Sequence, residues 1–357
     1  MGDPRIIWNE QKLLENVQLL NQTCRQAGID WIPVTKLVCA EEAIVASLYK
    51  AGIRSFADSR WQNLKKIKEQ HSDVQTLMLR LPSLSNVAET VRWADMSLVS
   101  ELATIRALHE EALRQQKRHR IILMVDLGDR REGVMPEDVL SLGKEIVGLS
   151  ATEWYGIGVN LTCLGGVIPT PEVMAELVEW KIAVEEQLGH QLQLVSGGNS
   201  SSLPLLLDRT MPAGITNLRL GEALFMGRET AYGERIPGMH DDVFRLEAEV
   251  IECKEKPSMP RGLIGMDSFG QKPVIVDKGI RRRAILAIGQ QDIPVSELVL
   301  TPEWAGIEII GASSDHLLVD VTDSSHPVEV GSILSFTLSY RGLLAAMTSP
   351  YLDKEKE

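Results

Sequence analysis

The sequence is poor in cysteine and has no long hydrophobic run. The four cysteines (Cys24, Cys39, Cys163 and Cys253) show neither CxxC nor Cys/His spacing, so neither a disulfide framework nor a zinc site is expected, and no metal is predicted. No stretch of 18 apolar residues occurs, and residues 1–5 carry no apolar signal region. We therefore expect no contact with a membrane and a soluble, cytoplasmic protein.

Basic residues are also in the minority. The formal net charge is -12, and the one dense basic run, residues 281–283, is short and typical of a solvated strand edge. Because a surface that binds phosphates needs clustered Lys and Arg, a nucleic-acid partner is not expected. With 357 residues, 44% of them hydrophobic, the chain is long enough for one large barrel or for two domains.

Short apolar runs alternate with helical patterns over the first two thirds of the chain. The runs are residues 31–35, 53–57, 76–79, 96–99, 121–126, 155–160, 192–195 and 217–220. Eight strands, each followed by a helical segment such as 41–50 or 139–147, predict a parallel (β/α)8 TIM barrel. An open doubly wound sheet is the alternative, but no GxGxxG opens the first helix.

The pattern changes after residue 237. Short β-branched segments separated by Gly, Pro, Asp and Ser turns predict an all-β domain. These segments are residues 245–251, 274–276, 284–288, 307–310, 317–321 and 333–338. We therefore place the barrel at 9–236 and the β domain at 237–357, with the strand-like residues 1–8 joining the β domain.

Lys36 is the most informative single residue. It ends the apolar run 31–35 and is followed by the apolar residues 37–39. Desolvation at the end of a buried strand disfavours the ammonium form, which makes a neutral, nucleophilic amine accessible. Such an amine forms Schiff bases with carbonyl compounds. The alternative is a lysine whose ammonium reaches water over its apolar stem.

Polar residues follow the predicted strands at the end where barrel enzymes build their sites. They are Lys36, residues 58–60, Arg80, Ser100, Asp126 with Arg131, Asn160, residues 197–201, Arg219 and Gly221. The last two strands are followed by glycine-containing loops, Gly197–Ser202 and Arg219–Glu222, and the first of these is also rich in serine. Glycines let the backbone approach a ligand, and amides at a helix start suit an anion. A phosphorylated ligand is expected there, opposite the lysine.

A carbonyl-reactive lysine and a phosphate cradle on one barrel suggest pyridoxal phosphate. The chain resembles the two-domain, pyridoxal-phosphate-dependent amino-acid racemases of the alanine racemase fold (fold type III), in particular their ornithine racemase-like branch. The matching stretches are residues 34–39, 57–60, 125–134, 197–201, 219–222, 288–292, 313–316 and 338–341. The resemblance spans nearly the whole chain.

The resemblance implies a role for each matching residue. Lys36 would hold the cofactor as a Schiff base and later move the substrate α-proton, while Ser200 or Ser201, the Gly221 backbone and Tyr340 would hold the phosphate.

Arg219 would face the pyridine nitrogen. Its guanidinium, with a pKa above about 12, cannot give up a proton, which favours reprotonation at the α-carbon over transamination. Asn199 belongs to the phosphate loop, Arg131 would lie near the phenolic oxygen, and Asn160 replaces a histidine that packs on the ring.

Two departures from the family pattern concern the second proton-transfer group and the substrate. Inversion needs an acid/base on each face of the α-carbon, yet the family's tyrosine is replaced here by Gln290. The nearest candidate is His316, beside Asp315, because histidine is a common general acid/base in proteins. The tyrosine that follows the lysine in alanine racemases is also missing from residues 37–40, which argues against alanine as the substrate.

We predict a racemase of a free amino acid, with ornithine-like or lysine-like substrates as candidates. It would act as a homodimer, since in the resembled family the β domain of one subunit closes the barrel mouth of the other. Arg80, Ser313 and Asp315 are predicted to bind the substrate. Asp58, Arg80 and Glu222 are charges at the barrel mouth that either bind the substrate or form an ion network.

Other activities stay open at this point. They are a pyridoxal-phosphate-dependent decarboxylase, a D-amino-acid lyase, a non-catalytic pyridoxal-phosphate carrier, and an aldolase that uses a Schiff base without the cofactor. Five histidines lie in charged helical or loop stretches and are predicted to be solvated: His71, His109, His119, His190 and His326.

Overall fold

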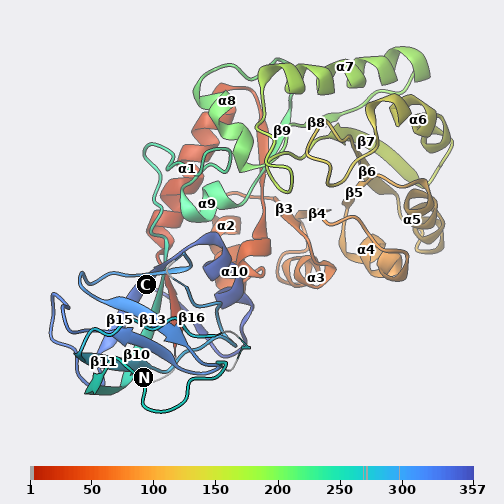
Figure 1. The fold of residues 1–357 in the computed structure, drawn as a ribbon. Coiled ribbons are helices and arrows are strands. Elements are labelled where there is room, and N and C mark those ends of the chain that lie inside the picture. Colours follow the sequence, from red (N-terminus) through yellow and green to blue (C-terminus); the bar gives the residue numbers. More distant parts are fainter. Residues whose placement is uncertain (1–3, 268, 271, 297) are drawn as a thin grey trace. The chain divides into compact units, whose positions relative to one another are not determined.

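The computed structural model describes residues 4–267, 269–270, 272–296 and 298–357. Its internal contacts divide the chain into two compact units. The barrel unit is Gln11–Asp241, and the β unit is the segment ending at Glu10 together with Asp242–Glu357. Both chain ends belong to the β unit (Figure 1).

The barrel unit contains eight parallel strands. They are β2 (Asp30–Pro33), β3 (Ser55–Asp58), β4 (Gln75–Met78), β5 (Met96–Val99), β6 (His119–Met124), β7 (Thr152–Gly158), β8 (Leu194–Ser196) and β9 (Asn217–Leu220). Their order is β2-β9-β8-β7-β6-β5-β4-β3, and a parallel bridge between Val34 and Ala57 closes the ring. The predicted barrel is confirmed. The first and last residues of its strands differ from those of the predicted apolar runs by zero to three positions.

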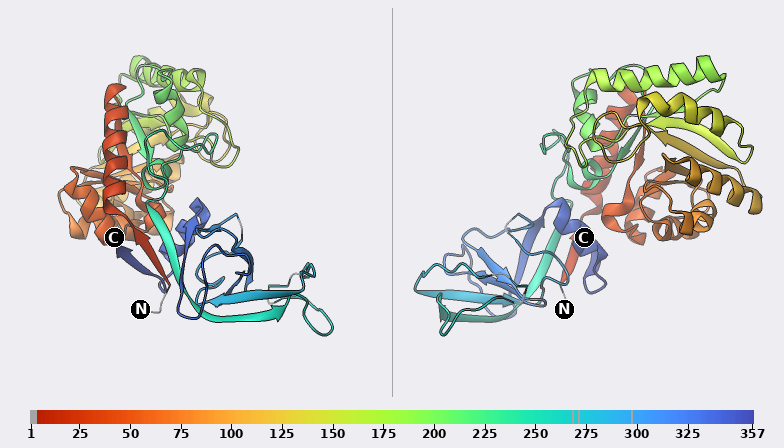
Figure 2. Two further views of the ribbon diagram at one scale, coloured as in Figure 1. Left: turned by 90° about the vertical axis from the view of Figure 1, so that its left-hand side faces the viewer. Right: turned by 45° about the vertical axis from the view of Figure 1, so that its right-hand side comes forward.

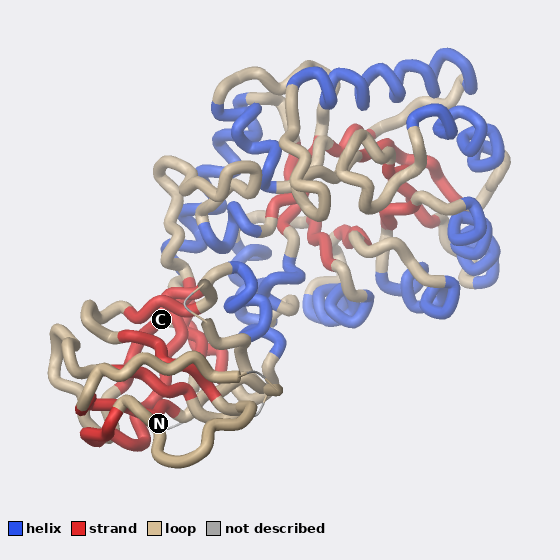
Figure 3. The backbone as a smooth tube through the Cα atoms, in the orientation of Figure 1, coloured by secondary structure: helices blue, strands red, loops and turns tan. Residues whose placement is uncertain are grey.

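Helices surround this ring of strands (Figures 2 and 3). They are α1 (Glu10–Gln26), α2 (Glu42–Lys50), α3 (Trp61–Gln70), α4 (Val87–Trp93), α5 (Leu102–Arg114), α6 (Val139–Val147), α7 (Pro171–Leu188), α8 (Leu203–Leu207) and α9 (Glu222–Met226). Local sequence sets their ends: α7 begins where the Thr170 side chain accepts a hydrogen bond from the Val173 amide and proline takes the first helical position.

Apolar side chains fill the inside of the barrel. The buried cluster consists of Ile32, Val34, Ala57, Leu77, Met96, Leu98, Ile122 and Met124. Burying each of the larger ones contributes about 1.5–3 kcal/mol to folding. The barrel is therefore a packed core, and any chemistry is restricted to its two ends.

The histidine at the start of β6 corrects one prediction. His119 is 1% exposed rather than solvated, and its Nε2 lies 2.9 Å from the Ser97 hydroxyl. Burial lowers the pKa of His119 to about 4, so the imidazole is neutral at physiological pH. The charged residues around it in the sequence belong to the surface, while the histidine side chain points inward.

The β unit contains a mostly antiparallel sheet. Its strands are β1 (Arg5–Trp8), β10 (Phe244–Pro257), β11 (Ile280–Leu286), β12 (Leu300–Pro302), β13 (Glu308–Ala312), β14 (Leu317–Asp320), β15 (Ile333–Leu338) and β16 (Asp353–Lys356). The path β12-β15-β10-β11-β14-β13 is extended by β1, which pairs antiparallel with β10 and parallel with β16.

The β unit differs from the prediction in several places, among them the short strands β12 and β16, which were not predicted. The predicted strand at 274–276 does not form, and Val274 is 95% exposed in an irregular segment. A helix that was not predicted, α10 (Tyr340–Thr348), follows β15. The basic run 281–283 lies in β11, which pairs on both sides with β10 and β14 and is not an edge strand. No helix in the described part of the chain is long and apolar enough to span a membrane.

Candidate active site

Lys36 lies in the first turn after β2. This turn is a short 3-10 helix, Thr35–Val38, which ends at Cys39 and Ala40 in the left-handed region (φ 50° and 48°). The Lys36 side chain is half-buried, and its Nζ forms no hydrogen bond with any described residue. Burial lowers the pKa of Lys36, and the nearby guanidinium groups lower it further. The structure therefore favours the nucleophilic amine form.

Asp58 supports the lysine turn from the neighbouring strand. Its carboxylate accepts hydrogen bonds from the Thr35 hydroxyl at 2.7 Å, the Arg60 amide at 2.9 Å and the Asn63 side-chain amide at 3.0 Å. The side chain is fully buried, and burial raises its pKa despite these bonds. With its acceptor capacity used inside the barrel unit, Asp58 is suited to holding the Lys36 turn in place.

The other two charges at the barrel mouth have their polar atoms available. Arg80 is exposed after β4, and no described residue pairs with its guanidinium. Glu222 is half-buried directly after Gly221, and its carboxyl group has no hydrogen-bond partner in the described ranges. Burial raises the pKa of Glu222 to about 7, while Arg228 and Lys36 act in the opposite direction.

Arg219 projects from β9 into the buried interior. It is 3% exposed and donates hydrogen bonds to the Ser196 hydroxyl and, at 2.9 Å, to the Val159 carbonyl oxygen. Burial lowers the pKa of Arg219 to about 10, which still leaves a guanidinium cation at neutral pH. The Ser196 hydroxyl in turn donates to Asn217 at 2.9 Å. Sequence reasoning missed Ser196, because its role depends on the register of β8 against β9.

The loop after β8 has the predicted cradle shape. Gly198 has φ +107°, a conformation that favours glycine, and a side chain there would lie 2.9 Å from the Ser202 hydroxyl. The Asn199 side chain caps the following turn by accepting a hydrogen bond from the Ser201 amide at 2.8 Å. The Ser200 hydroxyl accepts the Ala223 amide at 3.1 Å, which ties this loop to the one after β9.

Asn160, after β7, joins the same cluster. Its side-chain oxygen accepts a hydrogen bond from Asn199 Nδ2 at 3.1 Å, while its own Nδ2 is buried without a partner. The Ser201 hydroxyl is likewise buried without a partner among the described residues. Because buried donors that make no hydrogen bond are costly, two of them in one cluster indicate a position for a polar ligand.

Arg131 and Cys163 complete the mouth. Arg131 is paired with Glu132 and influences the pKa values of both Lys36 and Arg219. Cys163, three residues after Asn160, lies 3.6 Å from Asn199 Nδ2 through its thiol, which also contributes to the pKa values of Lys36, Arg131 and Arg219. The sequence offered no signal for Cys163, apart from its place in the loop after a barrel strand.

These residues fit pyridoxal phosphate. The Arg131 and Arg219 guanidinium groups both lower the pKa of Lys36, and Arg131 also lowers that of Arg219, a concentration of positive charge that an anionic ligand would relieve. The unpartnered hydroxyl of Ser201 lies in the cradle that suits a phosphate. The half-buried amine of Lys36 suits an aldehyde. No group of described His, Cys, Asp or Glu residues could hold a metal ion.

The remaining predicted site residues belong to the β unit. Gln290 and the turn Ser313–His316 are brought together by a hydrogen bond from the Gln290 amide to the Ser313 carbonyl oxygen (2.9 Å). His316 is exposed and paired with Asp315 at 3.2 Å, and Ser313 also donates to Asp315. Tyr340 begins α10 and is half-buried. The roles predicted for these residues stay predictions.

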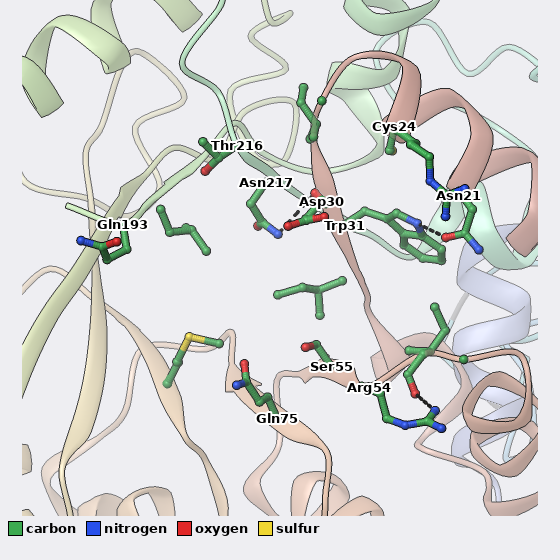
Figure 4. Close-up of a pocket in the computed structure, with 18 of the residues that line it drawn as sticks. Asn21, Cys24, Asp30, Trp31, Arg54, Ser55, Gln75, Gln193, Thr216 and Asn217 are labelled. Carbon is green, nitrogen blue, oxygen red and sulfur yellow. Dashed lines mark hydrogen bonds between the residues drawn. The ribbon is translucent and has the colours of Figure 1, made fainter.

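A cavity of about 610 Å³ lies at the other end of the barrel. Figure 4 shows the polar residues around it, and several of them stand at or just before the first residue of a strand. Examples are Asp30, Ser55, Gln75, Gln193 and Thr216. This cavity is therefore separated from Lys36 by the packed core of the barrel.

Comparisons with known proteins agree with this geometry. The family described as "Alanine racemase, N-terminal domain" matches residues 8–229. The chain is 47% identical over 99% of both chains to an ornithine racemase of Acetoanaerobium sticklandii. It is 38% identical to a lysine racemase of Thermotoga maritima, over 99% of this chain and 98% of that protein.

One solved structure carries the same fold over its full length. An alanine racemase from Bartonella henselae with covalently bound pyridoxal phosphate superposes with a TM-score of 0.76 at 18% identity, covering 100% of both chains.

Proposed function

The chain belongs to the alanine racemase family of pyridoxal-phosphate-dependent amino-acid racemases, and on that premise we propose that it interconverts the L- and D-forms of a basic amino acid of the ornithine or lysine type. The observation that carries the proposal is the half-buried Lys36 amine among Arg131, Arg219 and the cradle of Ser201. The high identity to an ornithine racemase and a lysine racemase over almost the whole chain supports the substrate class.

Each residue of the barrel mouth has a physical task in this reaction. Pyridoxal phosphate, when bound, supplies the aldehyde for the substrate amine and an electron sink that acidifies the α-hydrogen. Lys36 would hold the aldehyde, and its free amine would be the base that moves the α-proton of the substrate. Ser200, Ser201 and the Gly221 backbone hold the phosphate, and Asn199 and Asn160 orient that loop.

Arg219 can only donate hydrogen bonds to the ring nitrogen. Its guanidinium stays charged at neutral pH, so Arg219 would offer the ring nitrogen a hydrogen bond but no proton. This weakens the electron sink and favours return of the proton to the α-carbon, which is what a racemase needs and a decarboxylase does not. Among the alternatives, the racemase is therefore favoured.

Glu222 and Arg80, the two charged residues with available polar atoms, would each bind a different charged group of a basic substrate. We assign the side-chain ammonium to Glu222, whose carboxyl group lies near Lys36 without a hydrogen-bond partner in the described structure. An ammonium beside it would offset the cost of burying the carboxylate. The exposed Arg80 is assigned the substrate carboxylate, to which a guanidinium can bind in bidentate fashion.

The homodimer is part of this proposal, and so is the cytoplasmic location. In the resembled arrangement a partner subunit would bring its β unit, with Gln290, Ser313–His316 and Tyr340, to the barrel mouth. Sedimentation at micromolar concentration would test it. A monomer that racemises at full rate would contradict a site shared between subunits.

The central experiment combines three measurements on the wild-type protein. It should absorb visible light when isolated with the cofactor, lose that absorption on borohydride reduction, and carry the added mass on the peptide that contains Lys36. Solvent deuterium should then enter the α-position of ornithine or lysine and not of alanine. Added mass on another residue, or exchange with alanine alone, would contradict the proposal.

A further inference from the structure

The loop after β7 holds Cys163 in a defined place. The Asp129 carboxylate is buried and accepts hydrogen bonds from the amides of Cys163 (3.4 Å), Leu164 (2.9 Å) and Val167 (3.4 Å). The Thr162 hydroxyl closes the loop by donating to the Val167 carbonyl oxygen at 2.8 Å. Thr162 itself has φ 55°, which is unusual for a β-branched residue and is maintained only where surrounding contacts require it.

The Cys163 thiol is directed toward the site. Asn199 Nδ2, which also contacts Asn160, lies 3.6 Å from Cys163 Sγ. In the same cluster the Ser201 hydroxyl (residue 2% exposed) and Asn160 Nδ2 are buried without partners. These two unsatisfied donors mark the ligand position independently of the cysteine, and the thiol is exposed beside it.

Cys163 and Lys36 approach that position from different sides of the barrel. Lys36 follows β2 and Cys163 follows β7, which is three strands away from β2 in the closed ring of eight. Among charged or titratable groups, the Cys163 thiol has the largest effect on the pKa of Lys36, ahead of Arg131, Asp58 and Arg219, and its place in the cluster is given by its 3.6 Å contact with Asn199 Nδ2.

We propose that Cys163 is the second catalytic residue of the racemase and exchanges a proton with the substrate α-carbon on the face opposite Lys36. This inference rests on the racemase function proposed above. In one direction Lys36 Nζ takes the α-proton as the C–H bond breaks, and the Cys163 S–H bond then breaks as a new C–H bond forms on the other face. The thiolate regains a proton from solvent and the Lys36 ammonium releases one. The opposite direction exchanges the two roles.

The alternative second groups are less suited to this step. Gln290 has no titratable proton. His316 is exposed, paired with Asp315, and belongs to the β unit, whereas Lys36 belongs to the barrel unit. Cys163 belongs to the same unit as Lys36 and needs no second subunit.

The decisive experiment follows the α-hydrogen in D₂O with the Cys163→Ala and Cys163→Ser holoenzymes, both enantiomers being tested separately. We expect inversion to fall about 10²–10⁴-fold, the range for loss of a general acid/base. The enantiomer whose proton Lys36 removes should still exchange it with retention of configuration. Cys253→Ala, in the β unit, is the matched thiol control, and His316→Ala is the competing variant.

The outcomes separate the possibilities. A Cys163→Ala protein that inverts the α-carbon at a rate within about twofold of wild type overturns the proposal. It is also overturned if His316→Ala, and not Cys163→Ala, loses inversion while still exchanging the α-hydrogen of one enantiomer. If the wild-type protein exchanges no α-hydrogen at all, the proposed racemase function itself is wrong, and the role of Cys163 falls with it.

A readout independent of turnover uses the wild-type protein. Iodoacetamide should alkylate Cys163 in the cofactor-free protein, and bound pyridoxal phosphate should slow that reaction severalfold, with Cys253 unaffected. Peptide mass spectrometry measures both sites. Equal rates with and without cofactor would place the thiol outside the site and also overturn the proposal, even if the Cys163 variants fail to bind cofactor.

Discussion

The two ends of the barrel are both polar, yet only one is suited to chemistry. At the C-terminal end, Lys36, Glu222 and Ser201 keep polar atoms without hydrogen bonds to described residues, and the Arg131 and Arg219 guanidinium groups both lower the pKa of Lys36. At the N-terminal end, around the cavity of Figure 4, side chains such as Trp31, Arg54 and Asn217 are already bonded within the barrel unit.

A ligand site differs from a mere cavity in that some of its polar groups have no hydrogen-bond partner within the protein. The N-terminal cavity is spacious, but Trp31, Arg54 and Asn217 in its lining make hydrogen bonds within the barrel unit, which contribute to stability. At the C-terminal end, desolvated charged groups and donors without hydrogen-bond partners lower the stability of the cofactor-free protein. A ligand that supplies the missing partners recovers that cost.

The largest effect is expected for Lys36→Ala. Loss of the covalent link and of the base should remove the visible absorption and lower racemisation by about 10³-fold or more. Thermal stability of the cofactor-free protein should not fall, because a desolvated amine without a hydrogen bond is removed. The matched control is Gln75→Ala at the opposite end, for which turnover should stay within about twofold. A large loss in the control would abolish the contrast between the ends.

At the N-terminal end, the buried imidazole of His119 should make the free energy of unfolding depend on pH in the acidic range. The pKa of this histidine is about 4 in the folded protein and 6.5 when exposed. Between these values only the unfolded state binds the proton, so stability falls as the pH drops from 6.5 to 4 and the loss is complete near pH 4. The difference amounts to about 3 kcal/mol at 1.36 kcal/mol per pKa unit.

Urea unfolding across this pH range in wild type and His119→Gln would measure the effect. The variant should lose this part of the pH dependence while keeping cofactor binding. An identical pH profile in both proteins would show that the histidine is not buried in solution.

Ser201 and Ser202 offer a matched pair at the C-terminal end. Ser201→Ala removes a hydroxyl without a partner, so the cofactor-free protein should keep its stability while cofactor affinity falls about tenfold or more, as for a lost hydrogen bond to a charged group. Ser202 donates to the Gly197 carbonyl oxygen at 2.6 Å. Ser202→Ala should therefore cost about 1 kcal/mol of stability instead. Fluorescence titration and thermal melts distinguish these results, and a reversed pattern would contradict the cradle.

The smallest effect concerns selectivity. Glu222→Gln should raise KM for ornithine or lysine about tenfold and leave an uncharged amino acid unaffected, since one charge pair is lost. Because burial places the pKa of Glu222 near 7, the carboxyl group is neutral below that pH and anionic above it. The wild-type preference for basic substrates should therefore increase as the pH rises through 7. A flat preference, or equal losses for charged and uncharged substrates, would assign Glu222 another role.

Much of this molecule could be predicted from the sequence. The barrel follows from eight apolar runs at regular intervals, and the site follows from the rule that barrel strands deliver functional residues at their C-terminal ends. The prediction was wrong for the segment around Val274 and missed α10, because short β-branched or helical segments carry too little pattern to reveal whether a partner strand is available. It was also wrong for His119.

The amino-acid sequence by itself determined the alternation of strands and helices, the lysine at the end of the first barrel strand, and the glycine-containing loops after the last two, since these depend on residues close together in the chain. Only the tertiary structure decided that the Cys163 thiol contacts Asn199, that Asp58 supports the Lys36 turn while the Glu222 carboxyl stays available, and that Arg219 is held by Ser196. These relations arise from contacts between segments far apart in the chain, which barrel closure and strand register bring together and local sequence does not encode.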